Sequence, residues 1–141
     1  IRETEEKDQK KLSENLQGKR ILLAEDNALN AEIAMTILQA AGFIVELAEN
    51  GEECIQMLEE QPVGYYDLIL MDIQMPKMNG YEATEQIRKR TDGRENIPIV
   101  AMTANAFEED RKKAFAVDMN GHIAKPIDMT ALFAELERIF A

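Results

Sequence analysis

Short apolar runs recur along the chain, and a segment with helical spacing follows each of them. The five runs are residues 21–24, 43–45 with Leu47, 68–71, 97–102 and 122–124. Continuous apolar runs of this length are typical of strands that are buried on both faces. No two runs are joined by the two-residue turn of a hairpin. The pattern therefore predicts parallel strands that are connected through helices.

Five helices are predicted between and after these strands. In the first, Ile33 with Ile37 and Ala34 with Leu38 have the i, i+4 spacing of neighbours on a helix, and Gly42 marks its end. In the last, Asp128 is placed to cap the helix that carries the apolar positions 132, 136 and 140. The predicted helices are residues 27–41, one that opens at 50–51, one that follows position 80, roughly 107–117, and the one after position 128.

Alternation of five strands with five helices predicts an α/β fold. With right-handed crossovers, the helices cover both faces of a doubly wound five-stranded parallel sheet. The chain of 141 residues is long enough for one such domain, which we assign to residues 19–141. Residues 1–18 are polar and charged, with only Leu12 and Leu16 at helical spacing, so we interpret them as a linker or tail with a weak helical pattern. Because the chain starts at Ile1, we expect it to be cut from a longer protein.

Composition and charge exclude several classes of function. A net charge of −11 argues against nucleic-acid binding through a basic surface. No apolar run has the length of a membrane span, and the charged N-terminus lacks the apolar core of a secretory signal. We therefore expect a cytoplasmic segment that contacts neither nucleic acid nor membrane, although its parent chain could be membrane-anchored. A single cysteine, Cys54, excludes an internal disulfide and a multi-cysteine zinc site, and we expect it in the core.

Polar side chains stand directly after four of the apolar runs. They are Glu25 and Asp26 after the first run, Asp72 after the third, Thr103 after the fourth and Lys125 after the fifth. Each one alone could be a helix cap, a turn residue or a solvated charge. Because the carboxyl ends of parallel strands meet at one edge of a sheet, we expect all five to converge.

The predicted convergence has an electrostatic consequence. Two carboxylates about 4 Å apart repel each other by roughly 4 kcal/mol at an effective dielectric constant of 20. Lys125 offsets one of the three acidic charges, and a hard divalent cation such as Mg²⁺ suits the remainder. A carboxylate surrounded by a cation, an ammonium and a hydroxyl is an electrostatic template for phosphoryl transfer onto an aspartate.

These residues also carry a resemblance to a known family, the receiver domain of two-component signalling proteins. The resemblance covers residues 19–140, and it implies a CheY-like and flavodoxin-like (βα)5 fold with strand order 2-1-3-4-5. The motifs that carry it are Glu25-Asp26, Leu-Met-Asp-Ile-Gln-Met-Pro around Asp72, Asn79-Gly80, Ala-Met-Thr-Ala-Asn at 101–105, and Lys125-Pro126.

The resemblance implies a role for each residue of the predicted site. Asp72 would accept a phosphoryl group from the histidine of a kinase or of a histidine phosphotransfer domain. Asp72 and Asp26 would bind Mg²⁺ directly, together with the backbone carbonyl of Gln74, and Glu25 would act through water. Two further side chains, those of Thr103 and Lys125, would each contact a phosphoryl oxygen.

The resemblance also implies a conformational switch. His122 occupies the position where the family usually has Tyr or Phe, and histidine there is a departure that puts the strength and the pH behaviour of the switch in question. In this scheme the phosphorylated site draws Thr103 inward, and His122 repacks. The surface of residues 107–117, 122–124 and the last helix would then change its affinity for partners, including a second copy of the chain. The bond between Lys125 and Pro126 matches a position that is usually cis in the family.

Two other functions stay open at this point. An aspartate-nucleophile phosphohydrolase would need a second carboxylate two residues after Asp72, where this chain has Gln74. Slow self-dephosphorylation is expected, but turnover of external substrates is not. A degenerate interaction module would have lost part of the acidic site, and this sequence retains all of it. The sequences of residues 101–106 and 119–128 are similar to those of receivers at the C-terminus of hybrid sensor histidine kinases. We therefore expect the parent protein to be a hybrid sensor histidine kinase.

Overall fold

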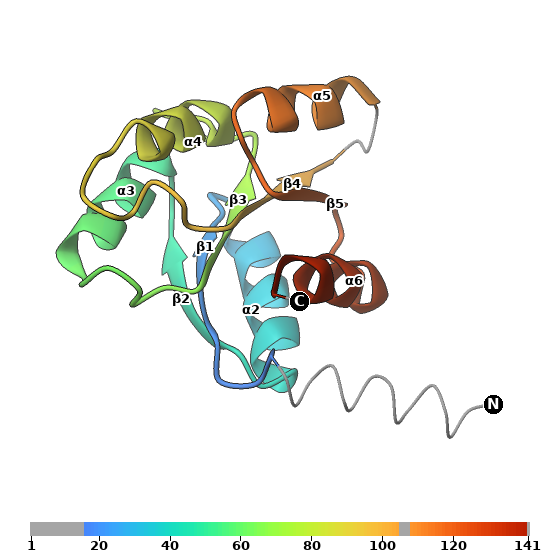
Figure 1. The fold of residues 1–141 in the computed structure, drawn as a ribbon. Helices are drawn as coiled ribbons and strands as arrows, with labels where there is room; N and C mark the ends of the chain where they lie inside the picture. Colours follow the sequence, from blue (N-terminus) through green and yellow to red (C-terminus); the bar gives the residue numbers. More distant parts are fainter. Residues whose placement is uncertain (1–15, 105–107, 141) are drawn as a thin grey trace.

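The computed structural model describes residues 16–104 and 108–140. Its centre is a five-stranded sheet with the order β2-β1-β3-β4-β5, in which all neighbouring strands are parallel (Figure 1). The predicted doubly wound sheet and its strand order are confirmed. The strands are β1 (Arg20–Ala24), β2 (Ile44–Ala48), β3 (Leu68–Asp72), β4 (Ile99–Thr103) and β5 (Gly121–Ala124).

Helices cover both faces of the sheet. The side chains of α2 and α6 pack on one face, and those of α3, α4 and α5 pack on the other (Figure 1). In the described residues the helices are α2 (Ala28–Ala40), α3 (Gly51–Glu60), α4 (Gly80–Arg88), α5 (Glu108–Ala116) and α6 (Met129–Phe140). Where the sequence predicted a specific first or last residue for a helix, the observed helix begins or ends within about one residue of it. Such a difference is within the normal variation of helix boundaries.

The core forms two layers because alternate residues of each strand point to opposite faces. Leu22 and Ile69 pack toward α3 and α4, whereas Leu23 and Leu70 pack toward α2 and α6. All five residues of β3 are buried, and so are all five of β4. Uninterrupted apolar runs in the sequence therefore correspond to strands with a helix layer on each side.

Asparagine side chains cap three of the helices. Asn27, Asn50 and Asn79 each accept a hydrogen bond from the backbone N–H three residues later. At the start of α4, the side chain of Glu82 also accepts from the backbone N–H of Asn79, which completes a capping box. These caps fix where the loops at the carboxyl edge of the sheet become helical.

The described residues begin at Leu16, three positions before the predicted start of the domain at residue 19. Leu16 is buried in the core between the sheet, α2 and α6. The backbone N–H of Gly18 donates to the carbonyl of Gly42, which ties this segment to the start of β2. The predicted linker character of residues 1–15 lies outside the described residues.

Candidate functional site

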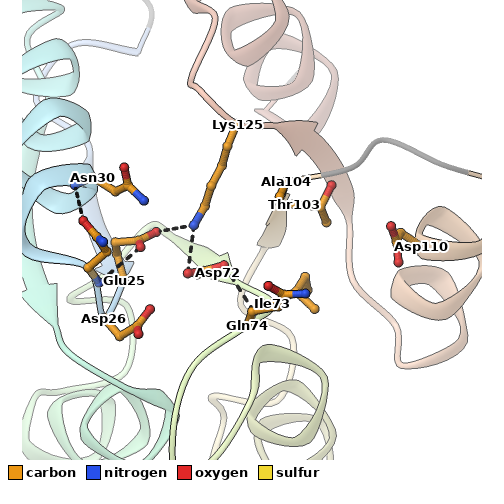
Figure 2. A pocket seen from close by; sticks show the side chains of 11 residues that line it. Glu25, Asp26, Asn30, Asp72, Ile73, Gln74, Thr103, Ala104, Asp110 and Lys125 are labelled. Atoms are coloured by element: carbon orange, nitrogen blue, oxygen red, sulfur yellow. Dashed lines mark hydrogen bonds and ion pairs between the residues drawn. The ribbon is translucent and has the colours of Figure 1, made fainter.

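An open cleft of about 350 Å³ lies at the carboxyl edge of the sheet. It is centred where β1 and β3 are neighbours, which is the point where the strand order reverses. Segments that are distant in the sequence contribute side chains to it (Figure 2). The lining residues are Glu25, Asp26, Asn27, Asn30, Asp72, Ile73, Gln74, Thr103, Ala104, Asp110 and Lys125.

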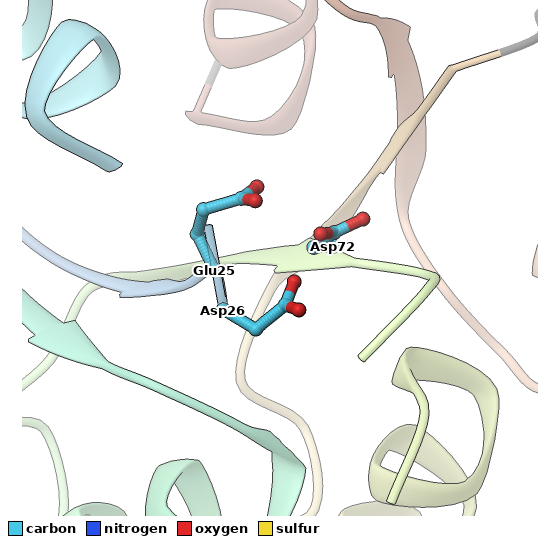
Figure 3. A group of neighbouring side chains, drawn as sticks. All are labelled: Glu25, Asp26 and Asp72. Atoms are coloured by element: carbon cyan, nitrogen blue, oxygen red, sulfur yellow. The ribbon is translucent and has the colours of Figure 1, made fainter. Parts of the chain in front are cut away.

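Three carboxylates meet at one side of this cleft. Glu25 and Asp26 follow β1, and Asp72 is the last residue of β3 (Figure 3). One oxygen atom from each lies within 4.8 Å of the others. Glu25 is only 3% exposed and Asp72 4%, whereas Asp26 is exposed to solvent. The predicted acidic cluster therefore consists of two buried carboxylates and one that faces the opening.

Lys125 connects the two buried carboxylates. Its Nζ lies 2.7 Å from Oε2 of Glu25 and 2.8 Å from Oδ2 of Asp72 (Figure 2). Burial raises the pKa of Asp72 to about 6, although Lys125 acts in the opposite direction. Burial alone would lower the pKa of Lys125, but its two carboxylate partners raise the pKa. At neutral pH the charged ammonium of Lys125 therefore lies next to Asp72, whose ionised form is disfavoured by burial.

The loop after β3 orients the carboxylate of Asp72. The backbone N–H of Gln74 donates to Oδ1 of Asp72 at 3.2 Å, while Oδ2 faces Lys125. The backbone N–H of Gly80 closes the same loop by donating to the carbonyl of Ile73 at 3.0 Å. Both oxygens of Asp72 are therefore engaged, and the group has one defined orientation in the cleft.

The donor set fits a magnesium ion. Mg²⁺ prefers oxygen ligands, and it commonly binds through one or two carboxylates while it retains several waters. Asp26 and Asp72 offer such oxygens, Glu25 stands behind them, and Gln74 lines the same cleft. Three carboxylates against one ammonium leave a negative excess that a divalent cation would neutralise.

Thr103 lies on the opposite side of the cleft, at the end of β4. Its Oγ1 is 3.0 Å from Nε2 of His122, which belongs to the adjacent strand β5. The backbone N–H of Lys125 donates to the carbonyl of Thr103 at 2.7 Å, and the bond between Lys125 and Pro126 is cis. The structure thus brings the two residues predicted for the switch into direct contact.

Sequence reasoning did not assign to the site three polar residues that line the cleft. Asn27 and Asn30 come from the start of α2, and Asp110 comes from α5. The spacing of Asn30 one turn after Asn27 is a signal that could have found it, since residues three apart share a helix face. For Asp110 no local pattern exists, because its place at the rim depends on how α5 packs against β4 and β5.

A five-stranded parallel sheet of this order, with an acidic cleft at its switch point, defines a CheY-like α/β domain. A family model described as the response regulator receiver domain matches residues 21–137. The chain therefore belongs to this family, whose members serve two-component and phosphorelay signalling. The resemblance noted in the sequence is confirmed.

Similar proteins include receiver domains of hybrid kinases. The chain is 37% identical over 127 residues to hybrid signal transduction histidine kinase B of Dictyostelium discoideum, covering 83% of this chain and 6% of that protein. It is 40% identical to the solved receiver domain of a sensor histidine kinase from Pseudomonas aeruginosa, with a TM-score of 0.70 and coverage of 86% and 93%. That structure holds a magnesium ion coordinated in its active site cleft.

A second solved structure includes a partner protein. The receiver domain of a response regulator from Saccharomyces cerevisiae was crystallised with the histidine phosphotransfer protein that precedes it in its pathway. Its chain is 32% identical to this one, with a TM-score of 0.71 and coverage of 82% of this chain and 84% of that chain.

Within the described residues, no helix has the length and apolar character needed to cross a bilayer.

Proposed function

We propose that this domain accepts a phosphoryl group on Asp72 from a phosphohistidine, in a reaction that depends on Mg²⁺. The observation that carries the proposal is the position of Asp72, which ends a fully buried strand between an ammonium and two further carboxylates. A purely structural carboxylate would have no need of two acidic neighbours within reach of the same cation site.

The residues of the cleft supply distinct parts of the reaction. An oxygen of Asp72 attacks phosphorus, the P–N bond of the phosphohistidine breaks, and the electron pair of that bond stays on the imidazole nitrogen. The product is an acyl phosphate on Asp72. Lys125 and Thr103 line the cleft where they would donate hydrogen bonds to phosphoryl oxygens. Bound Mg²⁺ would neutralise part of the charge on these oxygens. Its ligands would be Asp26, Asp72 and the carbonyl of Gln74, with Glu25 acting through water.

The partner in this proposal is a kinase or phosphotransfer domain that delivers its histidine to the cleft. Leu29 and Ile33 belong to the same helix as Asn30, which lines the cleft, and they are 66% and 46% exposed. Ile33 also borders a small hollow with Pro126 and Ile127, next to Lys125. Exposed apolar side chains on the helix that borders the cleft suit contact with a protein donor. The co-crystallised yeast receiver supports a partner of this class.

The wider context of the domain is also part of the proposal. The chain spans 6% of the length of the Dictyostelium kinase that it matches. We infer that it is the receiver of a hybrid histidine kinase, because three of its similar relatives, all from Dictyostelium discoideum, are hybrid kinases. Phosphorylation would change the surface of α5, β5 and α6, and a homodimer through that surface is one outcome that the proposal allows.

The competing functions make different predictions about Asp72. A phosphohydrolase lacks its second carboxylate here, because Gln74 stands two residues after Asp72. An interaction module without phosphorylation would not need the complete acidic cluster that the structure shows. Both alternatives predict that no stable phosphoryl label accumulates on the domain.

A small phosphodonor tests the proposal directly. Acetyl phosphate with Mg²⁺ should add one phosphoryl group, measured by intact-protein mass spectrometry, and chelation of the metal should abolish the gain. Asp72→Asn should remove the label, whereas Asp118→Asn should retain it. Asp118 is an exposed residue with a φ of 63°, which Asn tolerates well, so this variant matches the charge change away from the cleft. Labelling of Asp72→Asn to the wild-type level would rule out the assignment.

A further inference from the structure

The hydrogen bond between Thr103 and His122 joins the cleft to the far strand of the sheet. Oγ1 of Thr103 and Nε2 of His122 are 3.0 Å apart, and both residues lie on neighbouring parallel strands. We propose that His122 is a positioning residue that directs the hydroxyl proton of Thr103, and that its protonation state thereby tunes phosphoryl transfer to Asp72. This inference rests on the proposed function and adds a mode of regulation to it.

The imidazole can make this hydrogen bond in two opposite directions. In the neutral tautomer with the proton on Nδ1, Nε2 accepts the hydroxyl proton of Thr103, so that proton points away from the cleft. In the other tautomer, and in the imidazolium, Nε2–H donates to Oγ1 of Thr103. His122 then no longer accepts the hydroxyl proton of Thr103. When Thr103 donates this proton to a phosphoryl oxygen, the two hydrogen bonds, from Nε2–H to Oγ1 and from Oγ1–H to the phosphoryl oxygen, run in the same direction and reinforce each other.

Charged groups from two helices surround the imidazole of His122. Asp110 and Arg111 act on it from α5, and Glu135 acts from α6, where Glu135 is paired with Arg138 at 2.7 Å. On β4, His122 pairs with Ala101 in the strand register, and its side-chain partner there is Thr103; neither residue is charged. Burial and Arg111 lower the pKa of His122 below 6.5, against the opposing influence of Asp110 and Glu135. Near pH 7 the ring is therefore mostly neutral. Acidification converts it to the imidazolium, in which both ring nitrogens are hydrogen-bond donors.

This role differs in a measurable way from simple packing. If His122 only fills space, Phe should replace it with the same relative effect at every pH. If it directs the proton of Thr103, the ratio of the wild-type phosphorylation rate to the His122→Phe rate should rise as the pH falls from 8 to 5.5. The strength of one hydrogen bond corresponds to a rise of about two- to tenfold.

The decisive experiment measures these rates with acetyl phosphate and Mg²⁺ across that pH range. Ratios between variants cancel the titration of the donor and of Asp72, which all variants share. In a Thr103→Val background the rise should vanish, because no hydroxyl remains to be directed. A flat ratio, or the same rise in the Thr103→Val background, would overturn the inference. Absence of labelling in the wild-type protein would instead reject the proposed function.

A second measurement is independent of phosphorylation. His122 is the only histidine of the sequence, so the imidazole nitrogen signals of the untagged chain need no assignment. In the metal-free protein, Thr103→Val should change the balance of the two tautomers and shift the titration midpoint of the ring. Thr130→Val, in the exposed first turn of α6, should leave both unchanged. Identical nitrogen spectra for Thr103→Val and the wild-type protein would contradict the hydrogen-bonded role.

Discussion

Nζ of Lys125 lies 2.8 Å from Oδ2 of Asp72, although the two residues come from different strand ends. The same ammonium contacts Oε2 of Glu25 at 2.7 Å, so one positive charge holds two buried negative charges. Without a divalent cation the cleft therefore carries an unbalanced charge. We expect this charge imbalance to affect the stability of the domain. Substitutions of Lys125 and of Asp72 test the positive and the negative charge separately.

Removal of the ammonium should destabilise the metal-free domain. In Lys125→Met, Glu25 and Asp72 remain buried beside each other without a counter-charge. Loss of one partner from a buried pair typically costs about 3–5 kcal/mol, and because Lys125 is 21% exposed we expect about 2–4 kcal/mol here. Urea denaturation in the presence of a chelator measures this loss. Lys112→Met removes the same charge from an exposed site on α5 and should change the free energy of unfolding by less than about 0.5 kcal/mol. Equal losses in the two variants would contradict the proposed role of the pair.

Neutralisation of Asp72 should have the opposite sign at neutral pH. Burial raises the pKa of Asp72 from 3.8 to about 6, so between these values the folded state binds more protons than the unfolded state. The free energy of unfolding therefore falls as the pH rises through this window. Asp72→Asn escapes this loss and should be about 1–3 kcal/mol more stable than the wild type above pH 6 without metal. The difference should shrink toward zero near pH 4.

Thermal or urea unfolding at several pH values measures this dependence. Asp118→Asn provides the control, because it removes the same charge from an exposed position outside the cleft. Its stability relative to the wild type should not vary across the same window. A wild-type domain that is more stable than Asp72→Asn at pH 8 in chelator would show that the counter-charge of Lys125 outweighs burial.

The fold and the cleft could be predicted from the sequence because both follow from short, strongly patterned segments. The run 68–71 is fully apolar and Asp72 follows it directly, so one short segment predicts both the strand and the polar residue at its carboxyl end. In the same way, Thr103 ends β4, and Asp26 and Lys125 follow β1 and β5 within two residues. Since parallel strands place all their carboxyl ends at one edge, local patterns were sufficient to bring these residues together.

Other features depend on packing that no local pattern encodes. Ile33 has the same i, i+4 signal as Ala34, yet Ile33 is 46% exposed and Ala34 5%. Helix α2 is apolar around much of its circumference, so periodicity alone did not indicate which side faces the sheet. Likewise, the hydrogen bond between Thr103 and His122 depends on the register of β4 and β5, which sequence spacing does not specify.

Gly80 is required where α4 approaches the end of β3. A Cβ at this position would meet the carbonyl oxygen of Asp72, with Cγ of Met71 at 2.9 Å and Cα of Ile73 at 3.0 Å. Alanine favours helices over glycine, so any destabilisation by Gly80→Ala must come from this overlap with the backbone. We expect a loss of about 1–3 kcal/mol in urea unfolding, together with slower phosphorylation because the carboxylate of Asp72 moves.

A matched glycine tests this explanation. A Cβ at Gly121 would meet the side-chain ends of Glu135 and Arg138, which can rotate away into solvent. Gly121→Ala should therefore cost less than half as much stability as Gly80→Ala. If the two losses were the same, overlap with the backbone of Asp72 would not be the cause.

The core extends to Leu16, five residues before the segment that the family model matches. The side chain of Leu16 is 2% exposed, and it packs in the cluster between the sheet, α2 and α6. Nearby, Nζ of Lys19 lies 4.3 Å from the ring centroid of Phe140 at the end of α6. Truncation of a buried leucine removes apolar contacts and leaves a cavity, so Leu16→Ala should lower the free energy of unfolding by about 2–4 kcal/mol.

Leu29→Ala makes the same chemical change at a side chain that is 66% exposed, and it should cost less than about 0.5 kcal/mol. Urea unfolding of both variants, with the phosphorylation site intact, isolates the packing of Leu16. A chain that starts at Lys19 should lose stability to a similar degree as Leu16→Ala, because it lacks the same side chain. If that shortened chain unfolded at the wild-type urea concentration, Leu16 would lie against the core without contributing to it, and the domain would begin at residue 19.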